Sequence, residues 1–456
     1  MNDQQITDLL AATPQDPEPP LPPGLLEGLI PAARRDLRRR RATAALCAVA
    51  ALLLGTGVLL IPPVGGDTGP ALRPPGTATL PDRIAGYSPL TGTVGDSPPG
   101  RAIMLYGYGN SEMFSTYQSL VLSADTDAYR QLDAVSGYSG SWLLAPDGRT
   151  VVLAPPDRST AEVQVVDLET GQTREVRLPR AGGVTPLALS PDGHTLAYSV
   201  VDTTRIAGDL AMGVGNVIQQ HASEHGELVL LDLRTGRAVQ TGVGPAAAAA
   251  FAPDGRRLAV QSRLQTLLVG LDGGRQGELA VPQGYGITMH NAWSPSGGLL
   301  AVVPWAVEDW GTDRAYTLDY TRPGAVRTVS LAEPSALRVG AAETETFLGW
   351  LSDAEVLGRS WDYASDTGAL WAVPVDGSAP RVLSGFDAAY RCELGTQRCV
   401  PYEVAVAAGL LPELTVRPAG PPERGPWPIA FRLAALGLFL ALAVGGWWLV
   451  RRVRRR

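Results

Sequence analysis

The stretch that decides the fold is LALSPDGHTLAYS at residues 187–199, where two apolar runs flank a Ser-Pro-Asp-Gly turn. Proline cannot continue a strand ladder, aspartate favours a turn by bonding its own backbone, and glycine supplies a positive φ. Two apolar runs separated by such a turn predict a β-hairpin.

The same pattern recurs along the middle of the chain. The stretch at 187–199 is the second of five copies. The fourth copy carries Ser-Pro-Ser-Gly at 294–297, and the fifth, at 349–357, is degenerate. The prolines of the first four copies are 45, 62 and 42 residues apart, which indicates repeats of one structural unit. The turn residues of the first three copies are Asp147 and Gly148, Asp192 and Gly193, and Asp254 and Gly255.

A second hairpin follows most copies, with Asp-x-x-Thr-Gly turns at 167–171 and 232–236. Two hairpins in about 40–45 residues make four strands, which is the period of a propeller blade. The copies predict five blades, over 138–178, 184–242, 246–281, 288–331 and 345–384.

Strands for one more blade lie at the two ends of this region. Residues 102–108, 117–123 and 128–133 supply three of them, and either 402–406 or 413–416 supplies the fourth. This closure would leave no open sheet edge in the ring. We therefore predict an all-β domain, a β-propeller of six blades, with seven blades as the alternative.

The Ser-Pro-Asp-Gly-x-x-Leu-Ala copies resemble the repeats of TolB-like, WD-type β-propellers, and the resemblance covers about 100–418. It implies the fold but no activity, because propellers host enzymes, receptors and scaffolds alike. The Asp-x-x-Thr-Gly turns also resemble those of quinoprotein propellers, but the longer repeat of that family is absent. Every cation is an arginine, and Ala, Gly and Pro abound, so we expect an actinobacterial source with a G+C-rich genome.

Two apolar runs flank the predicted propeller. Residues 42–62 carry no charge, and residues 429–450 carry one, Arg432. Twenty helical residues span ~30 Å, the thickness of a bilayer core. Both runs therefore predict transmembrane helices, and the alternative for the first is a cleaved signal peptide.

The charges predict the orientation of these spans. Four arginines precede the first run, and the tail 451–456 carries five more after the second. The positive-inside rule places both clusters in the cytoplasm, so the segment between the spans is predicted outside the cell membrane. The chain has a net charge of −7, but residues 63–428 carry −13. This acidity argues against nucleic acid as a partner.

The remaining boundaries follow from composition. Residues 1–41 form a cytoplasmic head, 63–100 a Pro/Gly-rich linker, and 101–418 the propeller. Leucines at 25–29 recur at helical spacing, which predicts either a juxtamembrane amphipathic helix or a docking helix for a cytoplasmic partner.

Cys392 and Cys399 lie seven residues apart, just before a predicted closing strand. In the predicted orientation they are outside the membrane, where disulfides persist. We expect a disulfide between them, and the alternative is two free or metal-binding thiols.

Histidines supply the other candidate site residues. His221 and His225 with Glu224 would place two imidazoles on one helix face, as a zinc site needs. Their segment, 202–226, is a long insertion and the order differs from that of zinc proteases, so we interpret it as a solvated loop. A metal site is the alternative. His290 is predicted on an inner-type strand as an ordinary strand residue, and a place in a central channel site is the minor alternative.

Other motifs for catalysis are missing from the sequence. It has no nucleophile elbow, phosphate loop or dinucleotide fingerprint. We expect a membrane-tethered, extracytoplasmic, non-catalytic binding or scaffold module of a bacterial envelope, with a protein partner outside and no cofactor or metal. One alternative is a transmembrane signalling protein whose residues 1–41 bind a cytoplasmic regulator such as a sigma factor. The other is a metal- or quinone-dependent propeller enzyme.

Overall fold

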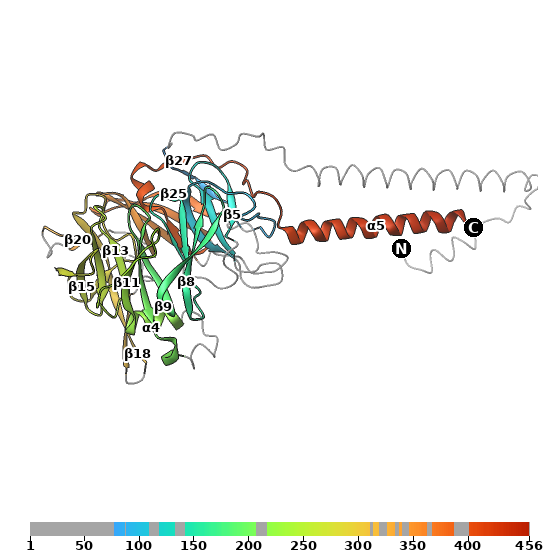
Figure 1. Ribbon diagram of the computed structural model, residues 1–456. Coiled ribbons are helices and arrows are strands. Elements are labelled where there is room, and N and C mark those ends of the chain that lie inside the picture. Colours follow the sequence, from blue (N-terminus) through green and yellow to red (C-terminus); the bar gives the residue numbers. More distant parts are fainter. Residues whose placement is uncertain are drawn as a thin grey trace, which may run out of the picture. The chain divides into compact units, whose positions relative to one another are not determined.

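The computed structural model describes residues 77–86, 88–108, 118–132, 142–206, 217–310, 313–318, 326–332, 337–339, 346–362, 367–386 and 401–455 (Figure 1). The chain divides into two compact units. One comprises Gly69–Phe431, and the other comprises Met1–Thr68 with Arg432–Arg456. The first unit holds every strand described below.

The strands of this unit form antiparallel meanders, as the repeats predict. The first meander joins both ends of the unit, because its inner strand comes from the C-terminal side. In spatial order its strands are β26 (Tyr402–Val406), β3 (Ala102–Tyr108), β4 (Gln118–Ser123) and β5 (Tyr129–Gln131).

The next two meanders share one long strand, β9 (Thr173–Leu189). Its first half pairs with β8 and its second half, from Gly183, pairs with β10. The second meander is β6 (Trp142–Leu144), β7 (Thr150–Leu153), β8 (Thr160–Asp167) and β9, and the third is β9, β10 (Thr195–Val201), β11 (Glu227–Asp232) and β12 (Ala238–Gln240).

Three further meanders complete the described set. The fourth is β13 (Ala248–Phe251), β14 (Arg257–Ser262), β15 (Gln265–Gly270) and β16 (Arg275–Leu279). The fifth is β17 (Tyr285–Ile287), β18 (Leu299–Trp310), β20 (Arg327–Ser330) and β21 (Leu337–Val339), and β19 (Asp313–Leu318) pairs with the far end of β18. The sixth is β22 (Thr346–Ser352), β23 (Glu355–Asp362), β24 (Thr367–Pro374) and β25 (Arg381–Phe386).

The inner strands of successive meanders lie side by side, which gives the propeller-like arrangement that the sequence predicts. β26 lies beside β6, β6 beside β9, β9 beside β13, and β13 beside β17, and β22 lies beside β26. The fifth and sixth meanders are joined by Trp350, whose indole N–H donates to the Ala292 carbonyl at 3.0 Å.

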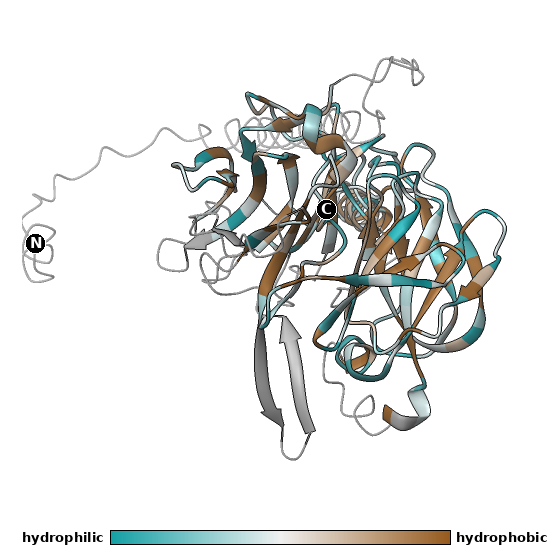
Figure 2. Ribbon diagram, turned by 90° about the vertical axis from the view of Figure 1, so that its left-hand side faces the viewer, coloured by the Kyte–Doolittle hydropathy of each residue, from teal (hydrophilic) through white to brown (hydrophobic). Residues whose placement is uncertain are grey.

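The core fills the spaces between neighbouring meanders. Separate clusters of buried residues lie between consecutive pairs; one joins Val163 of the second meander to Leu196 of the third. Figure 2 shows apolar residues, in brown, along the strands and polar residues, in teal, in many connecting turns. Trp142, Trp293 and Trp350 occupy equivalent positions in their repeats and are all buried, so they belong to the core.

Residues from 77 onward, expected as part of a linker, are instead built into the sheets. β1 (Thr79–Pro81) pairs with β27 (Thr415–Arg417), and β2 (Arg83–Ile84) pairs with the outer strand β25, both in parallel. Parallel pairing with strands more than 300 residues away leaves no local signal. Of the two candidates for the closing strand, 402–406 is β26, whereas the region 413–416 contributes to β27, which forms a separate two-stranded sheet with β1.

The insertion after β10 departs from the solvated loop that we expected. It contains a 3-10 turn, η1 (Thr203–Ile206), and a helix, α4 (Val217–His225). Val217, Ile218 and Ala222 of α4 are buried, and the first two pack with Val201 and Ile206. The helix forms because it buries this apolar stripe against the third meander.

The other unit contains one described helix, α5 (Ile429–Arg454). Its residues Phe431–Arg452 are long and apolar enough to cross a membrane, and no residue of the most apolar window is buried. Arg451 and Arg452 stack over Trp447 and Trp448, with guanidinium carbons 5.1 and 5.0 Å from the ring centres. The other predicted span, 42–62, and the head 1–41 lie outside the described residues.

Candidate functional site

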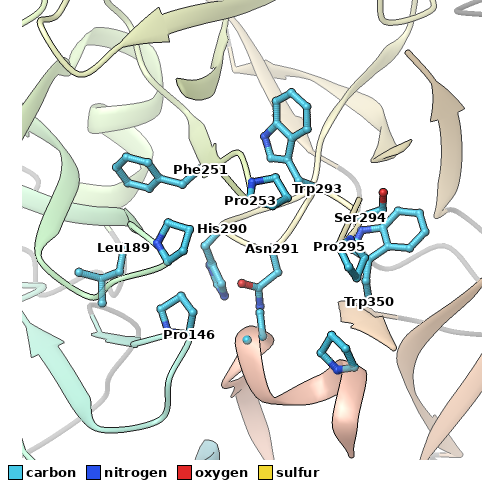
Figure 3. A pocket seen from close by; sticks show the side chains of 14 residues that line it. Pro146, Leu189, Phe251, Pro253, His290, Asn291, Trp293, Ser294, Pro295 and Trp350 are labelled. Atoms are coloured by element: carbon cyan, nitrogen blue, oxygen red, sulfur yellow. The ribbon is translucent and has the colours of Figure 1, made fainter. Parts of the chain in front are cut away.

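A cavity of about 230 Å³ opens where the repeat turns meet (Figure 3). Residues of all five repeat copies and of a 3-10 helix, η2 (Ala408–Glu413), line it. The lining residues are Pro146, Leu189, Pro191, Phe251, Pro253, His290, Asn291, Trp293, Ser294, Pro295, Trp350, Ala408, Gly409 and Pro412.

Three of the repeat prolines, Pro146, Pro191 and Pro253, reach this cavity two residues after the end of an inner strand, and Pro295 stands two residues after the isolated bridge of Trp293 to Leu300. The turns of successive repeats also lie against one another. A Cβ at Gly255 would lie 3.6 Å from Pro191, and one at Gly297 would lie 3.6 Å from Pro253. The same short motif, repeated around one axis, therefore builds an apolar wall from segments far apart in sequence.

The turn residues Asp147, Asp192 and Asp254 have one role in common. The carboxylate of each accepts a hydrogen bond from the backbone N–H two residues later, at 2.9–3.0 Å. The paired glycines Gly148, Gly193 and Gly255 have φ of 66–73°, the left-handed region that glycine tolerates. None of these six residues lines the cavity, so they act as turn formers.

Hydrogen bonds to these carboxylates lower two pKa values. Burial alone would raise the pKa of Asp192, but hydrogen bonds from the Ser190 hydroxyl and the His194 backbone N–H outweigh it. The Arg256 backbone N–H lowers the pKa of Asp254. Both aspartates are therefore held as carboxylates, which suits a turn acceptor rather than a proton donor.

The helix η2 closes one side of the cavity. The Gly409 N–H donates to the Pro146 carbonyl at 2.9 Å, and a Cβ at Gly409 would lie only 2.8 Å from that oxygen. Glycine is therefore required for η2 to approach the first repeat turn. Sequence reasoning missed the η2 residues because they lie outside the repeats.

His290 is the titratable side chain among the lining residues, and its ring points into the cavity beside Asn291 (Figure 3). Its φ of 23° lies in the left-handed region, a conformation that costs about 1–3 kcal/mol for a residue other than glycine. Burial among protein atoms lowers the pKa of His290 to about 4, so the ring is neutral near pH 7.

The polar contacts of the cavity are few. The Asn291 side-chain amide donates to the Leu348 carbonyl at 2.9 Å. No hydrogen bond joins the His290 ring to any residue in the described part of the chain. The neutral imidazole can therefore donate one hydrogen bond and accept another from a bound group.

The volume limits what can bind. Pockets for drug-sized molecules and cofactors have about 300–1,000 Å³, which is more than this cavity holds. Aromatic and proline side chains dominate the wall. The cavity is suited to one large apolar or aromatic side chain, and a tryptophan or tyrosine there could also hydrogen-bond His290.

The other sequence candidates divide into two groups. The structure brings His221, Glu224 and His225 together on α4, with their ligand atoms all within 4.8 Å of one another. Cys392 and Cys399 lie outside the described residues, so the disulfide between them stays a prediction.

Comparison with known proteins assigns no activity. No protein-family model and no curated protein matches the chain. Among solved structures, TolB from Acinetobacter baumannii is 14% identical, with 67% of each chain covered and a TM-score of 0.42. A putative TolB from Agrobacterium tumefaciens is also 14% identical, covering 63% of this chain and 90% of that chain, with a TM-score of 0.36.

An oligogalacturonate lyase in complex with manganese is 15% identical, covering 68% of this chain and 79% of that chain, with a TM-score of 0.38. These proteins, two of them TolB-like, are what the chain is similar to. At such scores none of them indicates what this chain binds or whether it is a catalyst.

Proposed function

We propose that this protein is a membrane-tethered, non-catalytic binding module, whose cavity receives an apolar side chain of a protein partner. The observation that carries the proposal is the cavity itself, an apolar enclosure with one neutral imidazole and a volume below that of cofactor sites. Proteins recognise one another through such buried anchors, often aromatic, held in well-packed pockets.

The module is a closed propeller of six blades. Pairing between β26 and β3 supports closure, because it joins the last strand of the ring to the first meander. The six described meanders support the number of blades. A closed ring would hold the cavity rigid, since each meander would have another meander on both of its sides.

The lining also supports a non-catalytic role. General acid–base or nucleophilic catalysis uses a base within hydrogen-bond reach of a nucleophile or an orienting group. Among the described residues His290 has no such partner, and the neighbouring amide of Asn291 is engaged by Leu348.

A photocrosslinking amino acid at Ala408, which lines the cavity, tests the binding site in native membranes. The matched control carries the same amino acid at Ser378, in an exposed turn after β24. We expect a protein adduct at position 408 that is absent at position 378, and that disappears when His290→Trp fills the cavity. Identical adducts at both positions, or an adduct that survives His290→Trp, would contradict the proposal.

The membrane topology is part of the same proposal. One span is α5, the second is the run 42–62, both arginine-rich ends lie in the cytoplasm, and the propeller lies outside in the cell envelope. The placement of α5 directly after the last strands of the propeller unit supports a tether at this end.

A membrane-impermeant maleimide tests this topology in intact cells. The protein carries Ser378→Cys, with Cys47 replaced by alanine and Cys392 and Cys399 by serine. The control carries a cysteine appended after Arg456 in the same background. We expect labelling of position 378 in intact cells and of the appended cysteine only after lysis. The reverse pattern would overturn the orientation.

A further inference from the structure

Three metal-ligating side chains meet on the last turn of α4. Within the described ranges, His221, Glu224 and His225 are the single group of three or more His, Cys, Asp or Glu residues whose ligand atoms are close enough to share an ion. The imidazoles of His221 and His225 are stacked, with ring centres 6.2 Å apart and planes at 29°. His225 Nε2 lies 3.7 Å from Glu224 Oε2.

The helix explains why these side chains converge. Residues three and four apart share one face of an α-helix, so Glu224 and His225 both lie one turn beyond His221. The helix itself is anchored by Val217, Ile218 and Ala222, which are buried beside this face. Because the backbone of α4 is held by this packing (Figure 1), the three ligands need only side-chain rotation to adjust.

The end of the helix is also anchored. The Gly226 N–H donates to the Ala222 carbonyl at 2.8 Å, and the Ser199 hydroxyl donates to the same carbonyl at 3.3 Å. The C-terminal end of a helix carries a partial negative charge, which favours a cation close by. His225 is the last residue of α4, so an ion held by this cluster would lie at the favourable end.

We propose that α4 carries a binding site for a borderline transition-metal dication such as Zn²⁺, with His221, Glu224 and His225 as its ligands. Imidazole nitrogen prefers such ions over Mg²⁺ and Ca²⁺, which take oxygen ligands. Two histidines and a glutamate form a donor set that zinc accepts, at bonds of about 2.0–2.2 Å.

The distances agree with this assignment. Ligand atoms around a tetrahedral zinc are separated by roughly 3.4 Å, given bonds of that length. The ligand atoms of the three side chains now lie within 4.8 Å of one another. To bind zinc they must therefore approach one another by about 1.4 Å at most. Three protein ligands leave one tetrahedral position open, which water or a group from another molecule would occupy.

Zinc titration of the detergent-solubilised full chain tests the site, with Cys47 replaced by alanine and Cys392 and Cys399 by serine so that thiols cannot contribute. The variants are His221→Ala, His225→Ala and Glu224→Gln, and the matched control is His194→Ala, a histidine outside the cluster. Removing a residue that hydrogen-bonds a metal ligand lowers the metal affinity about 10–100-fold. Removing a ligand itself should therefore lower it about 100-fold.

We expect each chain to bind one zinc ion. Either histidine substitution should lower the zinc affinity about 100-fold, and His194→Ala should leave it unchanged. With Cu²⁺ as the probe, electron paramagnetic resonance should show coupling to two nitrogens, reduced to one in each histidine variant. Absence of zinc binding, or equal binding in His221→Ala and the control, would overturn the proposal. These outcomes leave the cavity proposal untouched, because no residue of α4 lines the cavity.

Discussion

Arg130 and Glu423 are 293 residues apart in the sequence, yet Nη2 of the arginine lies 2.9 Å from Oε1 of the glutamate. The Arg130 guanidinium is almost fully buried, and it also donates to the backbone carbonyls of Ser97, Tyr129 and Glu423. One side chain thus ties the segment before β3, the outer strand β5 and the segment that leads to α5.

Replacing Arg130 by methionine should destabilise the propeller unit. The substitution removes the donor of the Ser97 carbonyl, whereas the Glu423 carbonyl keeps the Tyr129 N–H. A hydrogen bond to a charged group contributes about 1.5–3 kcal/mol. The free energy of unfolding, measured by denaturant titration, should fall by that order. Arg158→Met is the control, because Arg158 is mostly exposed and pairs only with its neighbour Asp157. An equal loss in both variants would contradict the role assigned to Arg130.

Gly409→Ala should displace η2 from the cavity. The added Cβ would lie 2.8 Å from the Pro146 carbonyl oxygen, which is backbone and cannot rotate away. Overpacking of this kind costs about 1–3 kcal/mol. Thermal unfolding should report the loss, and Gly277→Ala is the control, since a Cβ there meets no atom within 4 Å. A melting temperature for Gly409→Ala equal to that of the control would show that η2 is not held in this way.

The stability of the propeller unit should fall as the pH drops from about 6.5 to about 4. The unfolded chain protonates His290 near its ordinary pKa of ~6.5, whereas burial lowers the pKa in the folded protein to about 4. Between these values the unfolded state binds the extra proton, so acid favours unfolding. The contribution of His290, at 1.36 kcal/mol per pKa unit, is about 3 kcal/mol.

Denaturant titrations at several pH values measure this effect. His290→Gln should lose the part of the pH dependence that lies between about 4 and 6.5. His194→Gln, in a turn outside the cavity, should keep it. A wild-type and a His290→Gln protein with the same pH profile would contradict the burial assigned to His290.

Replacing each repeat tryptophan by phenylalanine should lower the free energy of unfolding by different amounts. The indole N–H groups of Trp293 and Trp350 donate to the carbonyls of Ala250 and Ala292, both at 3.0 Å. The indole nitrogen of Trp142 is buried and has no hydrogen-bond partner among the described residues. Leaving a buried acceptor unpaired costs about 1–3 kcal/mol, whereas removing an unpaired donor relieves a penalty.

Trp293→Phe and Trp350→Phe should therefore lower the free energy of unfolding by about 1–3 kcal/mol more than Trp142→Phe does. Denaturant titration measures the three variants under one condition. Equal losses in all three would mean that lost packing, rather than the hydrogen bond, decides their contribution.

The local pattern of the sequence determined much of this protein. Aspartate and glycine at positions such as 192 and 193 favour a turn through their own backbone, and the apolar runs beside them favour strands. These preferences act over a few residues, so the repeats, their meanders and the apolar span in α5 could be read without a structure. The membrane side of each part and the disulfide at Cys392 and Cys399 remain predictions.

Only the tertiary structure decided which distant segments meet. The strand that pairs with β3 is β26 rather than the region 413–416, because β27 pairs with β1 in a separate two-stranded sheet. His290 and η2 share one cavity, and the two histidines of α4 share one face. Nothing in a local pattern reports such pairings, since they depend on backbone hydrogen bonds and packing between residues that are far apart along the chain.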